Sequence, residues 1–240
     1  MMKRTVGLVF ADGMEYSPFE NYALENGGKK KIRHGNESIE FDLIEDGKTI
    51  TVIGVKCGIG KVNAASATAM LIVEDKADYI MNAGLSGAVS GCKKEDMVLG
   101  TTYVECDYDL TSIGYKPGEK PDGQPYIYKA DSTLLKLGEM SQGLIKGGLG
   151  TGDIFLTDNE KKKYFKEVFS ISAFDMETGA IASVCQKCDI PFLSVRKISD
   201  DADDCAGESY REMNDRQEEC LTQLLDNIIR RMFKETSIWE

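Results

Sequence analysis

The amino-acid sequence predicts an α/β protein of one domain, residues 1–240, with helices on both faces of a mixed, mostly parallel central sheet. Two observations predict this three-layer α/β/α class. Strand and helix patterns alternate along the whole chain, and several predicted strands are near-continuous apolar runs, which is typical of strands covered on both faces. The 240 residues, 42% of them hydrophobic, are also enough to form one buried core.

The first half of the chain contains five predicted strands. Residues 5–11 (TVGLVFA) are an apolar run, and residues 41–45 and 48–57 form a hairpin because the Asp-Gly pair between them favours a tight turn. Residues 58–76 open with glycines and continue at helical spacing, with an expected apolar face of Val62, Ala65, Ala69 and Ile72. The next two strands are predicted at residues 77–84 and 95–110.

The second half begins with a loop at residues 112–126, which are rich in glycine, proline and charge. Strand patterns then follow at residues 146–155, where a glycine-rich loop ends the segment, and at residues 190–199. Helical patterns are predicted at four places: residues 132–145, 159–168, 176–188 and 209–233.

The overall charge excludes one class of partner. A net charge of −11 argues against nucleic acid, because phosphate binding needs a concentrated basic face. The basic segment at residues 27–35 is interpreted as a solvated turn between glycines. No apolar run approaches the roughly 20 residues that cross a membrane, and the N-terminus does not resemble a signal peptide, so we expect a cytoplasmic protein without a membrane partner.

Seven cysteines in such a chain are expected to be reduced thiols. Cys185 and Cys188 form a CxxC pair, which could be a redox pair or half of a zinc site. A second metal-spaced pair is missing, and Cys185 falls on the predicted buried face of its helix. We therefore interpret Cys185 as a core residue and expect no metal.

Several predicted strands end in loops that carry small or acidic residues. In open α/β sheets, ligands bind beyond the carboxyl ends of the strands. We therefore expect these loops to converge around the site: residues 11–13, 57–60, 82–84 and 199–201.

Four carboxylic acids in these regions are candidates for chemistry. Asp175 fits the N-cap of the following helix, whereas Glu177 has small neighbours that leave room for a ligand. Asp200 is followed by three more acids, whose repulsion could raise its pKa so that it serves as a general acid; a solvated loop or a cation site is equally compatible. Glu15, taken alone, fits the first turn of a helix.

Taken together, seven sequence blocks resemble the nucleoside phosphorylase/nucleosidase superfamily, in the same order and over residues 6–210. The chain is most similar to the 5′-methylthioadenosine/S-adenosylhomocysteine nucleosidases. The blocks are VGLVFADGME, GVKCGIGKVNAASAT, IMNAGLSGA, DYDLTSIGY, TGDIF, FDMETGAIASVC and IPFLSVRKISDDAD. The resemblance implies cleavage of an adenine N-glycosidic bond through an oxocarbenium-like transition state, without a cofactor, by a homodimer.

The resemblance also implies a role for individual residues. Asp200 would protonate the purine at N7 with Ser199 holding its carboxyl, and Glu15 would activate the attacking water. Glu177 would bind the ribose hydroxyls, with Met176 packed against the sugar. The remaining substrate-binding candidates are Phe155 stacked on the base, the Leu156 backbone at the adenine edge, and Tyr210 near the alkylthio end.

Three features depart from the family pattern, the first being the FADGME run, which replaces a more acidic one. Three further functions also stay open. Leu85 replaces a residue that is usually small and polar, and Tyr210 adds a hydroxyl to a drier pocket. A purine nucleoside phosphorylase would need fixed arginines for phosphate; the IMNAGLSGA strand has none, and Arg196 does not discriminate because nucleosidases share it. A futalosine-type nucleosidase and a non-catalytic adenine-nucleoside sensor are also compatible with the sequence.

Overall fold

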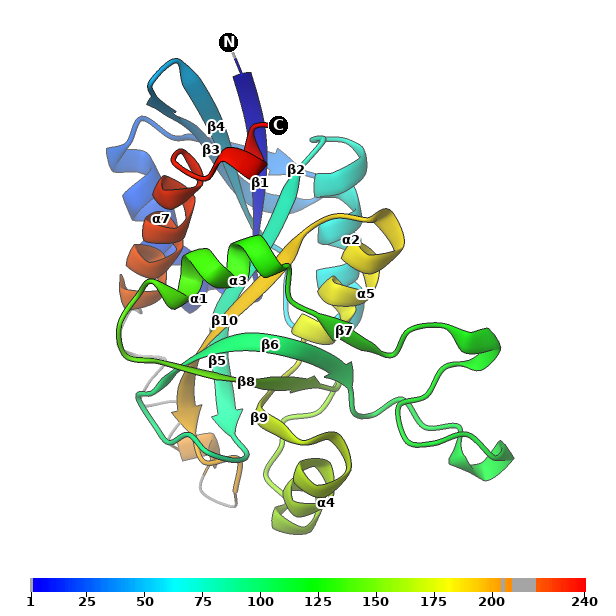
Figure 1. Ribbon diagram of the computed structural model, residues 1–240. Coiled ribbons are helices and arrows are strands. Elements are labelled where there is room, and N and C mark those ends of the chain that lie inside the picture. The colour runs from blue at the N-terminus through cyan, green and yellow to red at the C-terminus, as the bar shows by residue number, and fades with distance from the viewer. Residues whose placement is uncertain (1, 204–205, 209–218) are drawn as a thin grey trace.

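The computed structural model describes residues 2–203, 206–208 and 219–240, and it shows an α/β fold with a mixed sheet (Figure 1). Its strands are β1 (Met2–Phe10), β2 (Lys29–Arg33), β3 (Asn36–Glu45), β4 (Lys48–Lys56), β5 (Tyr79–Ala88), β6 (Met97–Glu105), β7 (Ile127–Lys129), β8 (Leu144–Thr151), β9 (Ile171–Asp175) and β10 (Phe192–Asp200). Its helices are α1 (Gly13–Glu25), α2 (Lys61–Val73), α3 (Ser132–Glu139), α4 (Asn159–Phe169), α5 (Thr178–Cys188) and α7 (Glu219–Met232), with short 3₁₀ turns η1 (Thr111–Ile113), η2 (Pro121–Gly123) and η3 (Thr236–Ile238). The predicted α/β class is confirmed.

The sheet contains a parallel block and a closed ring. Strands β4, β1, β5 and β10 lie side by side in parallel, so their carboxyl ends meet at one edge. Strand β10 also pairs with β6, and the pairing continues through β8 and β9 back to β5. The sequence did not predict this ring, because strand partners far apart in the chain leave no local pattern.

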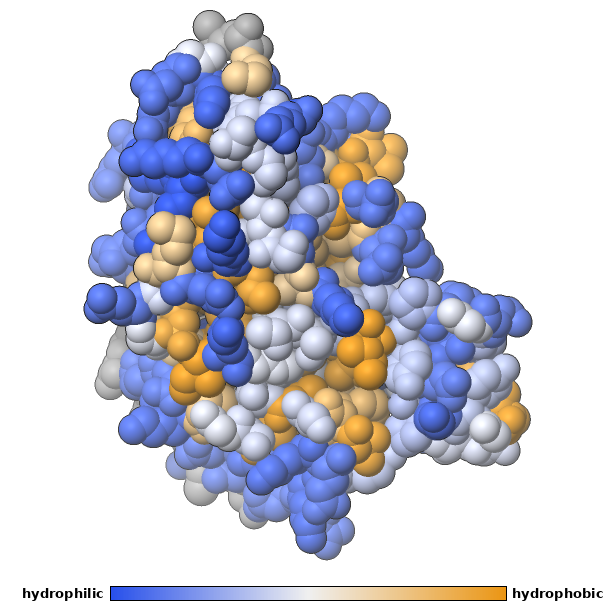
Figure 2. Space-filling view, in the orientation of Figure 1, coloured by the Kyte–Doolittle hydropathy of each residue, from blue (hydrophilic) through white to orange (hydrophobic). Residues whose placement is uncertain are grey.

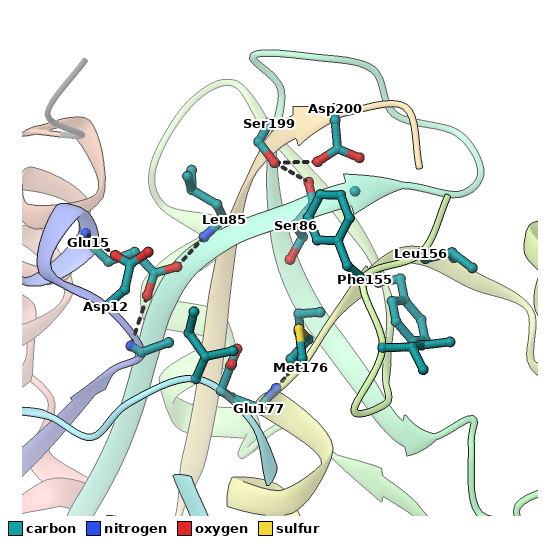
Figure 3. A pocket seen from close by; sticks show the side chains of 16 residues that line it. Asp12, Glu15, Leu85, Ser86, Phe155, Leu156, Met176, Glu177, Ser199 and Asp200 are labelled. Carbon is teal, nitrogen blue, oxygen red and sulfur yellow. Dashed lines mark hydrogen bonds between the residues drawn. The ribbon is translucent and has the colours of Figure 1, made fainter. Parts of the chain in front are cut away.

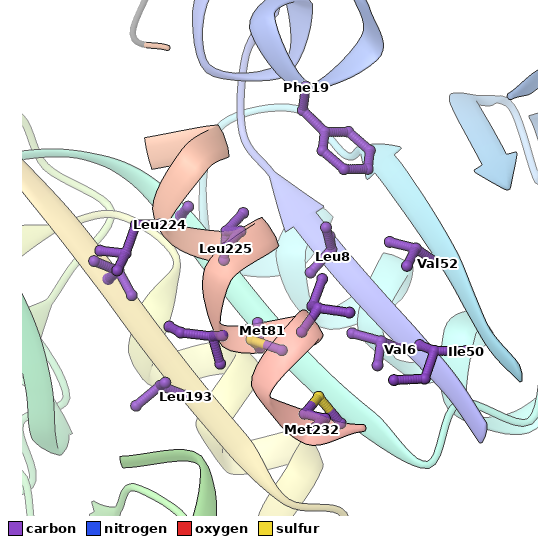
Figure 4. Close-up of a cluster of buried hydrophobic side chains, with 14 of the residues drawn as sticks. Val6, Leu8, Phe19, Ile50, Val52, Met81, Leu193, Leu224, Leu225 and Met232 are labelled. Atoms are coloured by element: carbon purple, nitrogen blue, oxygen red, sulfur yellow. The ribbon is translucent and has the colours of Figure 1, made fainter. Parts of the chain in front are cut away.

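Helices cover both faces of the sheet, as Figure 1 shows. Helices α1, α3 and α7 pack on one face and enclose the larger hydrophobic cluster, part of which is drawn in Figure 4. Helices α2 and α5 pack against each other on the opposite face, over a second cluster. These two layers hold the parallel block, and therefore its carboxyl ends, in a fixed position.

The buried face of α2 differs from the predicted one. Val62 is 79% exposed, and a different face of the helix is buried, which carries Ala64, Ala67, Thr68 and Leu71. Thr68 is acceptable there because its hydroxyl donates to the Ala64 carbonyl oxygen at 2.7 Å. Small side chains on this face let α2 approach α5 closely, and an apolar periodicity alone does not reveal that preference.

The basic segment was wrongly predicted as a turn. Residues Lys29–Arg33 form β2, an exposed edge strand that pairs antiparallel with β3. Lys31 and Arg33 both contact Glu40 on that neighbouring strand, so cross-strand ion pairs compensate for the shortage of apolar residues. The turn itself is confined to His34 and Gly35, which both have positive φ.

Element boundaries differ at three further places. Strand β5 continues to Ala88, so residues 82–84 are part of a strand and not a loop. Helix α3 ends at Glu139, and the residues that follow Gly143 (φ 77°) start β8. Strand β6 ends at Glu105; the segment beyond it projects from the body and is held by Lys120, which donates to Glu105 at 2.6 Å.

The position of Cys185 agrees with its interpretation as a core residue. Cys185 is buried in the core on α5 and Cys188 is exposed. Within the described ranges, no group of three or more His, Cys, Asp or Glu residues could hold a metal ion. Of the helices in the same ranges, none is both long and apolar enough to cross a membrane.

Because α7 packs against the sheet, two leucine substitutions should differ strongly in their effect on the free energy of unfolding. Leu225 on α7 is 1% exposed in the larger cluster, whereas Leu24 on α1 is 43% exposed (Figure 4 shows Leu225). Leu225→Ala should lower the free energy of unfolding by about 2–5 kcal/mol, because it removes buried apolar surface and leaves a cavity. Leu24→Ala, the helical control, should change it by less than about 1 kcal/mol. Urea unfolding of both variants measures the difference, and equal losses would contradict the assigned packing.

Candidate active site

One pocket of about 660 Å³, measured to its open mouth, lies at the carboxyl ends of the parallel strands β1, β5 and β10. Five acids line it: Asp12, Glu15, Asp175, Glu177 and Asp200. The described lining residues include no lysine, arginine or histidine. A pocket of this size and position is suited to a small molecule, with the acids available for proton transfer and for accepting hydrogen bonds.

Glu15 is held by the backbone on two sides of the pocket (Figure 3). It lies in the first turn of α1, just after β1, and its carboxylate accepts from the Ala11 N–H at 2.9 Å and the Leu85 N–H at 2.7 Å. Burial raises the pKa of Glu15 to about 8, against the opposing influence of the Arg196 guanidinium. A carboxyl with this pKa exchanges its proton near neutral pH, as a general acid or base must.

Asp175 and Glu177 have different structural roles. Asp175 ends β9, and its Oδ1 accepts from the N–H groups of Glu177 and Thr178 at 2.9 Å. It thus bonds backbone groups at the start of α5, but the N-cap residue is Glu177 and not Asp175 as predicted, because the helix begins only at Thr178. Glu177 is 4% exposed, and its Oε1 accepts from the Gly60 N–H at 3.0 Å. Burial raises the pKa of Glu177. Asp175 therefore organises the helix start, and Glu177 faces the pocket.

Arg196 lies behind the pocket and holds these acids in place. Its side chain is fully buried, 3.2 Å from Asp175 Oδ2 and 3.7 Å from Glu177 Oε2. It also donates to Asn82 Oδ1 at 2.5 Å and to Thr178 Oγ1 at 2.7 Å. A buried arginine with this many partners is committed to the protein, so it is poorly placed to bind an anion in the pocket.

Asp200 occupies the end of β10, where the pairing with β5 is irregular between Ile198 and Asp200. Its Oδ2 accepts from Ser199 Oγ at 2.7 Å and its Oδ1 from the Ala202 N–H at 2.8 Å. The pKa of Asp200 is raised, mainly by burial, and the neighbouring Asp201 and Asp203 contribute less. The predicted direction is correct, but the predicted cause, repulsion within the acidic run, is secondary.

Apolar side chains form the rest of the pocket lining. Leu156 and Leu85 are buried, whereas Phe155 is 47% exposed at the mouth. Met176 lies beside Glu177 between the two ends of the pocket (Figure 3). Such surfaces suit a flat aromatic ring and an aliphatic group.

The structure brings eight of the nine predicted site residues to this pocket; the ninth, Tyr210, lies outside the described residues. Sequence reasoning missed other lining residues, among them Ile59, Ser86 and Ile154. Ser86 carried a usable signal, since it is a polar residue inside the apolar strand β5. The two isoleucines carried none, because an isoleucine in a loop has no distinguishing pattern.

Comparison with known proteins identifies the family. The sequence profile described as the phosphorylase superfamily matches residues 5–230. The chain belongs to the phosphorylase superfamily. It is 38% identical to the 5′-methylthioadenosine/S-adenosylhomocysteine nucleosidase of Geobacillus sp. strain WCH70 over 172 residues, which are 68% of this chain and 74% of that protein.

Solved structures agree with this assignment. The 5′-methylthioadenosine/S-adenosylhomocysteine nucleosidase of Helicobacter pylori, crystallised with an amino-pyrrolopyrimidine pyrrolidine ligand, has a TM-score of 0.86 and 25% identity, covering 96% of this chain and 100% of that one. A futalosine hydrolase mutant of the same organism has a TM-score of 0.85 and 23% identity, covering 95% of this chain and 99% of that one. The second likeness shows the fold alone. The resemblance predicted from the sequence blocks is confirmed by these superfamily members.

The raised pKa of Glu15 predicts a pH-dependent stability. Because the folded-state pKa of about 8 exceeds the ordinary value of 4.5, the stabilising effect of the buried neutral carboxyl is complete below pH 4.5 and is lost as pH rises toward 8. Glu15→Gln removes this titration, so the melting temperature of the variant relative to the unmodified protein should increase by several degrees between pH 5 and pH 8.5.

The matched control is Glu25→Gln at the exposed end of the same helix, which makes the same chemical change away from the pocket and serves as the reference for the Glu15→Gln difference. Differential scanning calorimetry of the three proteins measures both effects. A Glu15→Gln difference that stays constant across this range would contradict the assigned pKa.

Proposed function

We propose that this protein hydrolyses the N-glycosidic bond of 5′-methylthioadenosine and S-adenosylhomocysteine, releasing adenine and the thioribose. One observation carries the proposal: two buried acids, Glu15 and Asp200, reach the same pocket from opposite ends, with Glu177 between them (Figure 3). An acid at one end and a base at the other is the arrangement that glycoside hydrolysis requires. The nucleosidases of the superfamily that resemble this chain support the choice of substrate.

Asp200 is the proposed general acid for the purine N7. Burial raises its pKa, which favours the protonated carboxyl that an acid catalyst needs. The hydroxyl of Ser199 and the N–H of Ala202 each bond one oxygen of the carboxyl, so its orientation is restricted. Protonation at N7 lets the base depart as neutral adenine when the C–N bond breaks.

Glu15 is the proposed base for the attacking water. Two backbone N–H groups fix its carboxyl group, and with a pKa of about 8 the deprotonated form is basic enough to take a proton from water as the oxocarbenium-like sugar forms. Glu177 is the proposed acceptor for the ribose 2′- and 3′-hydroxyls, with Met176 against the sugar. Negative charge at Glu177 would also stabilise the developing positive charge on the ribose.

The apolar part of the pocket is proposed to hold the base and the 5′ substituent. Phe155 would stack on adenine, and the Leu156 backbone would bond its polar edge. Leu85 places an aliphatic side chain beside Glu15, which favours an uncharged neighbour such as an alkylthio group. Tyr210 remains a candidate for the alkylthio end and lies outside the described residues.

Water is favoured over phosphate as the nucleophile. A phosphate dianion buried without arginine is costly, and the described lining contains five acids and no basic side chain. The nearby Arg196 is bonded to Asn82, Thr178 and Asp175. These facts disfavour a phosphorylase. None of the described pocket residues favours a futalosine-type nucleosidase or a non-catalytic sensor.

We further propose a homodimer that works in the cytoplasm. Two large apolar side chains that line the pocket are exposed, Ile59 (53%) and Phe155 (47%), as is Val62 (79%) in the first turn of α2, and a second copy could cover them. Figure 2 shows other hydrophobic side chains at the base of the projecting segment before β7. The six described cysteines are free thiols, as suits a reducing compartment.

The test of function is the identity of the products from 5′-methylthioadenosine, with and without phosphate. Hydrolysis yields adenine and methylthioribose at a rate that phosphate does not change, because water is the nucleophile. Mass spectrometry of the reaction measures both products. Phosphate-dependent formation of methylthioribose 1-phosphate would replace this proposal with a phosphorylase, and no turnover would favour a futalosine-type nucleosidase or a sensor.

Replacing the general acid should slow the reaction strongly. Asp200→Asn keeps the side-chain shape but cannot protonate the purine, so kcat should fall by about 10²–10⁴-fold while the melting temperature changes little. Asp201→Asn at the adjacent exposed position is the control and should retain kcat within about twofold. Adenine release followed by chromatography measures both variants. An Asp200→Asn enzyme with normal kcat would remove Asp200 from the mechanism.

A further inference from the structure

Ser86 on β5 has a buried hydroxyl that the proposed mechanism does not use. The residue is 4% exposed and lines the pocket. Its Oγ has no hydrogen-bond partner among the described residues, whereas the nearby Ser199 Oγ bonds Asp200. A buried hydroxyl without a partner is unfavourable, so its persistence at the wall of a pocket points to a partner on the ligand.

The backbone places Ser86 at the Asp200 end of the pocket. Its carbonyl oxygen accepts from Ser199 Oγ at 3.3 Å, and the next residue, Gly87, pairs with Asp200 across β5 and β10. An added Cβ at Gly87 would lie 2.8 Å from Asp200 Oδ1, which shows how closely this strand approaches the carboxyl. Figure 3 likewise shows Ser86 beside Ser199 and Asp200, far from Glu15.

We propose that the Ser86 hydroxyl donates a hydrogen bond to the purine base of the bound nucleoside. This inference rests on the proposed function, in which Asp200 marks the position of the base. A purine offers several ring nitrogens as acceptors, and Asp200 engages only one of them. A hydrogen-bond donor at a second ring nitrogen would hold the base in the pocket. It would also stabilise the electron density that the base gains as the glycosidic bond breaks.

The test uses Ser86→Ala and two ligands, 5′-methylthioadenosine and free adenine. If the hydroxyl bonds the base, the inhibition constant of adenine and the KM of the nucleoside should both rise by about 5–10-fold, the usual effect of one lost hydrogen bond. The melting temperature should not fall, because Ser86 Oγ has no partner in the described protein. Ser86→Thr, which keeps a hydroxyl, should recover adenine affinity, and the exposed Ser66→Ala control should resemble the unmodified enzyme.

The outcomes separate this inference from the proposed function. Unchanged adenine affinity in Ser86→Ala would overturn the inference, including the case in which only the nucleoside binds more weakly, since that result places the hydroxyl on the sugar. If the unmodified protein does not cleave 5′-methylthioadenosine, the proposed function fails. Calorimetric titration of adenine then still measures the contribution of Ser86 to base binding.

Discussion

The site depends on one buried positive charge, the guanidinium of Arg196. It is fully buried on β10 and contacts Asp175 at the end of β9 and Glu177 just before α5. It also bonds Asn82 on the neighbouring strand. An isolated buried arginine would be strongly destabilising, so these contacts must form together as the strands and helix assemble. The arginine therefore couples the formation of the fold to the placement of the acids.

The close approach of Glu15 and Arg196 leaves no room for a side chain at one position of β5. Gly84 lies between the two charged groups, because an added Cβ there would be 2.3 Å from Glu15 Oε1 and 2.4 Å from Arg196 Nη1. Only a residue without a side chain lets both approach the same strand. Three acids, Glu15, Asp175 and Glu177, interact electrostatically with Arg196. For Glu15 and Glu177, burial raises the pKa by more than the attraction of the arginine lowers it. The raised pKa values of these two acids are thus a consequence of their own burial, which the arginine offsets only in part.

The parallel arrangement of β1, β5 and β10 explains why residues far apart in the chain share one pocket. Glu15 follows β1, Leu85 is on β5 and Asp200 ends β10, and the carboxyl ends of these strands are adjacent. The irregular pairing at the end of β10 allows Ser199 to bond both β5 and Asp200. Local backbone geometry at the strand ends therefore sets the orientation of the proposed general acid.

The sequence by itself determined the class of the fold, most of the elements and eight residues that now lie around the pocket, because periodicity, caps and ordered motifs are local properties. Tertiary structure decided which face of α2 is buried, the β2 edge strand, the ring closed by β10 and the dominance of burial in the pKa of Asp200. It also decided that, among the described residues, the Ser86 hydroxyl has no hydrogen-bond partner. Each of these depends on contacts between residues distant in the chain, whose energies no local pattern records.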